Sequence, residues 1–307
     1  MENFPDWPSL LQDAISALSN GHSGRETFLR VNGDAVIRAL AALPVDRGSP
    51  RLGAGGCVVV NMSAAHIPTL IQSGAYKNCY ELDRDARRLG DPMRTSPKRR
   101  LVDDALKPLH KKRVEEIYFA AIEFNGCGVG FYGDCCLVLK DDVTRDNVVV
   151  LDRNSYDLIR EPLWTQIAET ARTENISKLE AQKRAAAQRA GRMCDHLASI
   201  AAIKVLESRQ PVMRLLTTGA VSEGVLDDED YIEVLRPKTF DISDVREVRL
   251  VPADVALDER IRSRALVGEP PSQAEALWRG RRRAAEANLR AKAVPVRVMT
   301  TAGRTKG

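Results

Sequence analysis

Three short runs in the middle of the chain decide the fold: residues 117–124 are IYFAAIEF, residues 135–140 are CCLVLK and residues 147–152 are NVVVLD. Each run is rich in β-branched or other apolar residues, and Gly, Asn and Asp punctuate the segments between them. Apolar runs of four to eight residues bounded by turn residues are typical of β-strands. The middle of the chain therefore predicts a sheet of short strands joined by tight connections.

A further strand and a short helix are expected before this block. Residues 57–62 are the apolar run CVVVNM, and the segment after them places Ile67 and Leu70 on one helix face before Gly74, a residue that commonly ends helices. Residues 1–50 carry apolar side chains at helical spacing and predict a helical preface.

The second half alternates between helical and strand patterns. Residues 84–113 are polar, basic and interrupted by prolines, which predicts a loop. Residues 161–206 are rich in alanine and predict helices with a joint at Gly191. Residues 247–252 (EVRLVP) predict the last strand, and a basic helix with a frayed tail is expected within residues 256–307.

Composition describes an ordinary globular protein. The 307 residues contain 46 Lys and Arg against 42 Asp and Glu, and 44% are hydrophobic. No uncharged apolar run approaches about 18 residues, so no membrane-spanning helix is expected. The first ten residues, MENFPDWPSL, lack the pattern of a signal peptide, and a cytoplasmic setting is expected. The six cysteines form no CxxC pair and the four histidines are scattered, which predicts reduced thiols and no metal site.

The order of these signals resembles the ADP-ribosyltransferase superfamily, with the closest likeness to the DarT-type toxins that modify DNA. Three features carry the resemblance: LIQSG closes the helix after the first strand, Tyr118-Phe119 opens the second block, and Glu233 lies in the late strand YIEVL. The resemblance covers roughly residues 57–252.

The resemblance implies an α+β fold built on a split mixed sheet. It divides the chain into a helical preface (1–50), an ADP-ribosyltransferase-like domain (51–255) with a helical insertion (161–206), and a basic C-terminal helix and tail (256–307).

The same resemblance implies that NAD is the substrate and that Glu233 is catalytic. It also implies NAD contacts for a set of residues around the first two strands: Asn61, His66, Gly74, Tyr76 and Tyr118. The sequence departs from the family at one point, because the family places His or Arg on the first strand and this strand has Asn61, with His66 five residues later.

Physical chemistry supports these roles and leaves alternatives open. ADP-ribose transfer expels nicotinamide through an oxocarbenium-like transition state, which a carboxylate such as Glu233 can stabilise. A glutamate between apolar strand neighbours can equally face solvent. Tyr118 could stack on nicotinamide or fill the core, and Asn61 needs partners if it is buried.

The local charge suggests a macromolecular acceptor. Residues 93–113 contain eight bases and two acids, and residues 278–307 contain nine bases and one acid. Such runs can bind phosphates or serve only solubility. The candidate nucleic-acid contacts are the bases of the first run: Lys98, Arg99, Arg100, Lys111, Lys112 and Arg113. The acidic run between residues 223 and 230 favours instead a basic protein surface as acceptor.

Three functions follow as hypotheses. The first is a mono-ADP-ribosyltransferase that modifies a nucleic-acid base or a protein side chain, acting as an intracellular toxin or effector with an antitoxin or immunity protein as partner. The second is a non-catalytic nucleic-acid-binding module of the same fold. The third is an NAD glycohydrolase, with water as acceptor.

Overall fold

The computed structural model describes residues 57–90, 95–110, 113–123, 126–140, 148–151, 153–192 and 231–299, and residues 9, 12, 13, 16, 27, 28 and 31. Those seven early positions are helical, as the preface predicts; the remainder of residues 1–50 lies outside the described part. The helical stripe expected at 193–206 and the acidic run at 223–230 also lie outside it.

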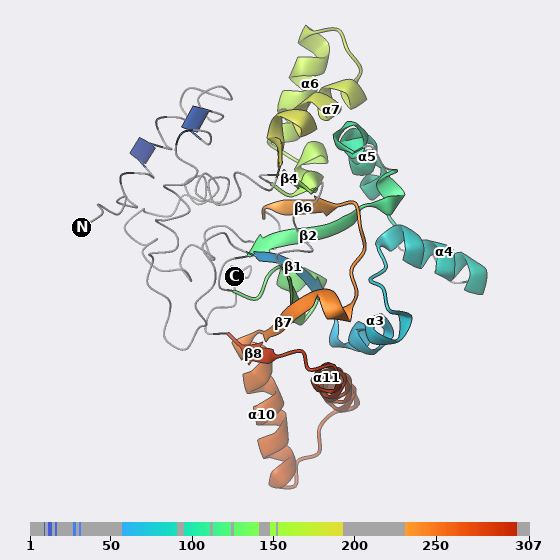
Figure 1. The fold of residues 1–307 in the computed structure, drawn as a ribbon, viewed down its shortest axis with the longest axis vertical. Helices are drawn as coiled ribbons and strands as arrows, with labels where there is room; N and C mark the ends of the chain where they lie inside the picture. The colour runs from blue at the N-terminus through green and yellow to red at the C-terminus, as the bar shows by residue number, and fades with distance from the viewer. Residues whose placement is uncertain are drawn as a thin grey trace.

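Within the described residues, eight strands form one mixed sheet in the order β5-β4-β6-β2-β1-β3-β7-β8 (Figure 1). Neighbouring strands are antiparallel, except that β7 and β8 are parallel. The strands are β1 (Cys57–Met62), β2 (Tyr118–Glu123), β3 (Cys135–Leu139), β4 (Val149–Leu151), β5 (Ala190–Arg192), β6 (Glu233–Arg236), β7 (Val245–Leu250) and β8 (Val296–Val298).

The two central strands separate halfway along their length. β1 pairs with β2 from Cys57 to Val59, and beyond Val59 it pairs with β3 alone. On β2, Tyr118 to Ala121 pair with β6, while the end of the strand pairs with β1. Past the Val59–Ala121 pair, the backbones of β1 and β2 are therefore bonded only to their outer neighbours.

Helices cover both faces of the sheet. The α-helices are α3 (Ile67–Ser73), α4 (Cys79–Leu89), α5 (Pro97–Leu106), α6 (Leu163–Thr173), α7 (Lys178–Arg189), α10 (Pro252–Leu266) and α11 (Gln273–Ala291). α3 and α11 bury Ile67, Leu70 and Leu289 against one face. On the other face, α5, α6 and α7 form a second core near β4 and β6 (Figure 1). No helix in the described part is long and apolar enough to cross a membrane.

The loop expected over residues 84–113 is wrong, because α4 and α5 occupy most of it. Asn78 caps α4 in a reciprocal capping box with Glu81. Ser96 caps α5, and Pro97 takes its first position, where the missing N–H costs nothing. Pro97 and Pro108 therefore lie at the starts of helical segments instead of preventing them.

Two further expectations need correction. Gly191 is not a joint between helices, because it lies in β5 and pairs with Val150 of β4. Residues 247–252 do not form the last strand: β8 follows and extends the sheet beside β7, and Pro252 starts α10.

The basic helix expected near the C-terminus is confirmed as α11, but several of its arginines are committed to neighbouring acids. Arg279 bonds Asp258 of α10 at 2.6 Å. Arg282 lies 3.4 Å from Glu286 of its own helix. Past the helix, Arg297 lies 2.8 Å from Glu247 of β7. The Arg279 pair joins α11 to α10, and the Arg297 pair joins β8 to β7.

Candidate active site

A cavity of about 810 Å³ lies where β1 and β2 separate. Its wall is formed by the ends of both strands, the α3–α4 loop, α5, the turn before β3, the segment after β4, and Glu233 of β6. This volume lies in the upper part of the range for small-molecule sites, roughly 300–1,000 Å³. The fold thus brings together segments that are up to about 170 residues apart in sequence.

Glu233 reaches this cavity from the first position of β6 and is 2% exposed. Its carboxylate accepts a 2.9 Å hydrogen bond from the backbone N–H of Ser155, the first residue of the 3₁₀ helix η6 (Ser155–Ile159). Burial raises the pKa of Glu233, while the Arg99 charge and the Ser155 hydrogen bonds oppose this rise. Because Glu233 is buried, it is not a glutamate that faces solvent from the outer side of its strand.

Arg99 supplies the opposite charge from the adjacent wall. Its guanidinium lies 3.8 Å from the Phe119 ring centroid, and one nitrogen lies 2.5 Å from the Asp103 carboxylate, one helical turn along α5. A second nitrogen donates to the Ser155 hydroxyl at 3.4 Å. Burial disfavours the charged form, but the Asp103 and Glu233 carboxylates outweigh it and raise the pKa of Arg99.

One donor of this guanidinium remains available. Nε of Arg99 is buried and has no hydrogen-bond partner among the described residues. Buried polar groups are almost always bonded, so such a donor beside a cavity indicates a ligand position. Three bases line the site, Lys77, Arg99 and Arg160, and Glu233 is the one Asp or Glu among its described lining residues. Lys77 is paired with Asp85 and Arg99 with Asp103, acids that lie outside the lining.

Asn61 lines the cavity, but its amide already holds the protein backbone. Nδ2 donates to the carbonyls of Cys127 (2.8 Å) and Gly133 (3.2 Å), and Oδ1 accepts from the N–H of Val129 at 2.9 Å. Both N–H bonds are used, so the amide can contact NAD only through a remaining lone pair of Oδ1. The asparagine on the first strand therefore fixes a turn.

His66 and Tyr76 also line the cavity, on the side of α3. His66 is exposed at the end of the 3₁₀ helix η1 (Ala64–His66). Tyr76 stacks on Phe240, with ring centroids 4.7 Å apart, and burial raises its pKa to about 12. Gly74 ends α3 with φ 66°, as the sequence predicts, and is not among the lining residues.

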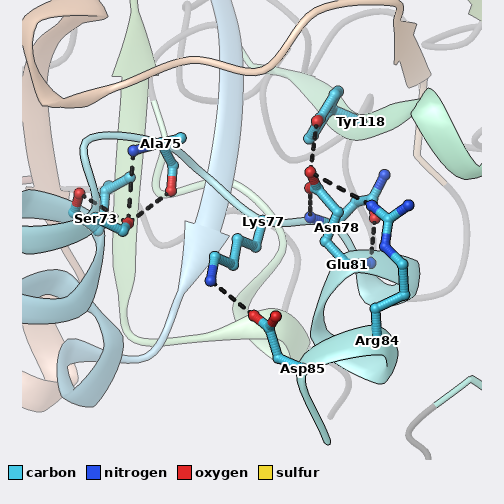
Figure 2. Close-up of polar contacts among 9 residues, drawn as sticks. Ser73, Ala75, Lys77, Asn78, Glu81, Arg84, Asp85 and Tyr118 are labelled. Atoms are coloured by element: carbon cyan, nitrogen blue, oxygen red, sulfur yellow. Dashed lines mark hydrogen bonds and ion pairs between the residues drawn. The ribbon is translucent and has the colours of Figure 1, made fainter. Parts of the chain in front are cut away.

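The structure does not bring Tyr118 into this wall. Tyr118 is not among the lining residues, although its neighbours Phe119 and Ala120 are, and its ring lies 6.2 Å from that of Tyr76. Figure 2 shows the Tyr118 hydroxyl pointing to Glu81, to which it donates at 3.2 Å. In the same loop Lys77 reaches Asp85, with 2.7 Å between Nζ and the carboxylate (Figure 2).

The six bases expected to bind nucleic acid separate into different environments. Lys98, Arg100 and Arg113 are exposed, whereas Arg99 is buried and faces the cavity. Lys111 and Lys112 lie outside the described residues.

The sequence did not predict three features of the cavity wall: the Phe119 ring, the Ser155 backbone N–H and the position of Arg99 beside Glu233. A signal for Arg99 existed, because Ser96-Pro97 marks a helix start and Arg99 with Asp103 has the i,i+4 spacing of a helical ion pair. No local pattern marks Ser155, whose backbone meets Glu233 from 78 residues away.

No family model, curated protein or solved structure matches this chain.

Proposed function

We propose that this chain is a mono-ADP-ribosyltransferase that transfers ADP-ribose from NAD to a macromolecular acceptor. One observation carries the proposal: the Glu233 carboxylate and the Arg99 guanidinium line one cavity at the point where β1 and β2 separate. Two of the three segments on which the family resemblance rests, Tyr118-Phe119 and Glu233, lie on the adjacent strands β2 and β6. The third, LIQSG, closes α3, the helix that follows β1, which is the other neighbour of β2.

The lining suits NAD as a substrate. Its pyrophosphate is anionic, and the exposed Arg160 supplies positive charge at the cavity, beside Lys77 and Arg99, which are paired with Asp85 and Asp103. Its two ring systems can rest against the aromatic lining, which includes Tyr76 and Phe119. The unpartnered Nε of Arg99 offers a buried donor to a phosphate or ribose oxygen.

In the proposed reaction the bond between C1′ of the ribose and the nicotinamide nitrogen breaks. Its electron pair stays on that nitrogen, so neutral nicotinamide leaves and positive charge develops on the ribose. The Glu233 carboxylate, which is shielded from solvent by burial, stabilises this charge. A nucleophile of the acceptor then bonds to C1′, and its proton passes to Glu233 or to water.

The charge state of Glu233 makes the rate depend on pH. Stabilising the developing cation requires the ionised carboxylate, and burial raises the pKa of Glu233 above its ordinary value. Nicotinamide release is therefore expected to fall, as the pH is lowered, at a higher pH than an exposed glutamate would give. The apparent pKa in the pH dependence of the rate of nicotinamide release measures this shift.

The setting proposed for this enzyme is the cytoplasm, where it acts as a toxin or effector restrained by an antitoxin or immunity protein. The five cysteines in the described part, Cys57, Cys79, Cys127, Cys135 and Cys136, are free, which suits a reducing compartment.

The decisive experiment compares Glu233→Gln with the wild type and with Glu180→Gln, a partly exposed residue on α7 that is not among the cavity-lining residues. Nicotinamide release should fall roughly 100-fold or more for Glu233→Gln and stay unchanged for Glu180→Gln. Equal rates for Glu233→Gln and the wild type would refute the proposal.

A second arm identifies the acceptor. Labelled NAD is incubated with the protein and a cell lysate, which is then treated with nuclease or with protease. Nicotinamide release without label on any polymer identifies an NAD glycohydrolase. Salt-sensitive nucleic-acid binding without NAD binding identifies the non-catalytic module.

A further inference from the structure

The Asp103 carboxylate is held from two helices at once. One oxygen accepts a hydrogen bond from a terminal nitrogen of Arg99 at 2.5 Å, and the other accepts from the hydroxyl of Tyr80, on α4. Asp103 is 3% exposed, and neither Asp103 nor Tyr80 is among the cavity-lining residues. Arg99, which does line the cavity, is therefore the side chain through which they reach a ligand.

The buried position of this ion pair carries a desolvation penalty. Burial raises the pKa of Asp103, and the charge of Arg99 and the hydrogen bonds from Arg99 and Tyr80 oppose this rise. On the same helix, Asp104 and Lys107 form a pair that stays largely exposed and avoids most of this penalty. A buried pair contributes little net stability compared with apolar side chains in its place. Its position beside the cavity therefore favours a role in binding.

Arg99 is fixed in orientation as well as in position. Its guanidinium carbon lies 3.8 Å from the Phe119 ring centroid, and its second terminal nitrogen donates to the Ser155 hydroxyl at 3.4 Å. A guanidinium is planar, so contacts at both terminal nitrogens and on its face also fix the direction of its Nε–H bond. Nε is buried and has no hydrogen-bond partner among the described residues. The protein thus holds this donor in one direction and leaves its acceptor position open.

Helix α4 gives Tyr80 a rigid base. Tyr80 is the second residue of the helix, next to the capping box that Asn78 and Glu81 form (Figure 2). Nδ2 of Asn78 also donates to the carbonyls of Glu115 (2.8 Å) and Ile117 (3.1 Å), just before β2. These bonds fix the start of α4 against the sheet, and with it the hydroxyl that holds the Asp103 carboxylate.

We infer that Asp103 and Tyr80 are positioning residues for NAD: they hold the Arg99 guanidinium so that its Nε–H meets a ribose or phosphate oxygen of the substrate. Because Ser155 bonds both Arg99 and Glu233, the two groups that would meet the substrate are fixed relative to each other. This inference rests on the proposed transferase function and adds to it two residues outside the cavity.

The first test measures binding of ADP-ribose, which keeps both riboses and the pyrophosphate of NAD and is not cleaved in the proposed reaction. Calorimetric titration of the full chain compares the wild type with Tyr80→Phe, Asp103→Asn and Asp104→Asn, a partly exposed control on α5. Tyr80→Phe should weaken binding roughly 3- to 10-fold and Asp103→Asn roughly 10-fold, whereas Asp104→Asn should bind like the wild type. Thermal unfolding verifies that each variant is folded. Wild-type affinity in either Tyr80→Phe or Asp103→Asn would overturn the inference.

A double-mutant cycle separates positioning from a general loss of structure. Arg99→Gln removes the Nε donor and should by itself weaken ADP-ribose binding roughly 10- to 100-fold. If Tyr80 acts through Arg99, Tyr80→Phe should cause no further loss in the Arg99→Gln background. An equal loss in both backgrounds would show that Tyr80 only stabilises α4, and the positioning role would be refuted.

Steady-state kinetics give an independent readout. An Nε–H bond made equally in the ground state and the transition state affects substrate binding alone. Tyr80→Phe should therefore raise KM for NAD by the factor by which it weakens ADP-ribose binding, and it should change kcat by less than about 2-fold. A fall in kcat at unchanged KM would contradict a role through Arg99.

The two proposals can fail separately. If ADP-ribose binding depends on Tyr80 through Arg99 but the wild type releases no nicotinamide, the positioning role stands and the transferase is refuted. If nicotinamide release depends on Glu233 but Tyr80→Phe and Asp103→Asn bind ADP-ribose like the wild type, the transferase stands and the positioning role is refuted.

Discussion

The backbone N–H of Ser155 donates a 2.9 Å hydrogen bond to the carboxylate of Glu233. This contact joins the start of η6 to the first residue of β6, and Asn154 caps the same 3₁₀ helix through the N–H of Tyr156. The backbone of Ser155, and not only its side chain, therefore orients the carboxylate. A substitution of the Ser155 side chain leaves this backbone N–H in place. A site held in this way meets the requirement that electrostatic groups be preorganised before the charge of the transition state develops.

The buried ion pair of α5 should contribute to stability. Asp103→Ala leaves Arg99 buried with less compensation and should lower the free energy of unfolding by about 3 kcal/mol. Denaturant unfolding measures this change. Asp104→Ala is the matched control, because its pair with Lys107 is largely exposed and should contribute less than about 1 kcal/mol. Equal losses for the two variants would show that burial of the Arg99 pair is unimportant.

Glu233→Gln should change stability in a pH-dependent way. The pKa of Glu233 is raised in the folded protein, so the folded state retains its proton to a higher pH than the unfolded chain does. Wild-type stability from this group is therefore present at low pH and lost as the pH rises through the folded pKa. Relative to the wild type, Glu233→Gln should become more stable as the pH rises from about 4 to 7. A difference in unfolding free energy that stays constant across this range would contradict the shift.

Two glycines should respond in opposite ways to alanine. Gly128→Ala requires a left-handed conformation (φ 69°) and displaces the Asn61 amide, so it should lower stability by about 2 kcal/mol. Gly280→Ala lies within α11 with no atom within 4 Å of the new Cβ and should raise stability by roughly 1 kcal/mol. Thermal unfolding of both variants checks the pair, and a stable Gly128→Ala would mean that the turn between β2 and β3 is adjustable.

Cys79 should report occupancy of the cavity. It lines the cavity and is partly exposed, whereas Cys57 is buried with its pKa raised to about 11. Burial also raises the pKa of Cys79, so alkylation should be slow at neutral pH and faster at pH 9. Peptide mapping by mass spectrometry should show Cys79 modified before Cys57 and protected by NAD. Modification of Cys79 at the same rate with and without saturating NAD would place the ligand elsewhere.

Much of the sheet could be predicted from the sequence. Cys57–Met62, Cys135–Leu139 and Val245–Leu250 form strands where apolar runs indicate them, because burying β-branched residues on both faces is a local preference repeated along the run. The helices within residues 84–113 were harder to predict, because the charged residues and prolines of this segment suggest a loop. Their cap residues, Asn78 and Ser96, carry the information that composition hides.

The candidate site was predicted in part. Glu233, His66 and Tyr76 line one cavity, whereas Tyr118 is not among its lining residues and donates its hydroxyl hydrogen to Glu81. Asn61 shows a different limit. Its amide is polar in an apolar strand, so partners were required, but only the tertiary structure reveals that these partners belong to the turn between β2 and β3.

The sequence by itself determined most of the strands and that Glu233 lies within one, because these features depend on residues a few positions apart. Tertiary structure decided which charges meet. Arg99 belongs to a basic run in the sequence, yet folding buries it against Asp103 and beside Glu233, while Arg279 and Arg297 pair with acids far along the chain. The physical reason is that ionic contacts depend on distance in space and on burial. Neither is fixed until the sheet places β1, β2 and β6 side by side.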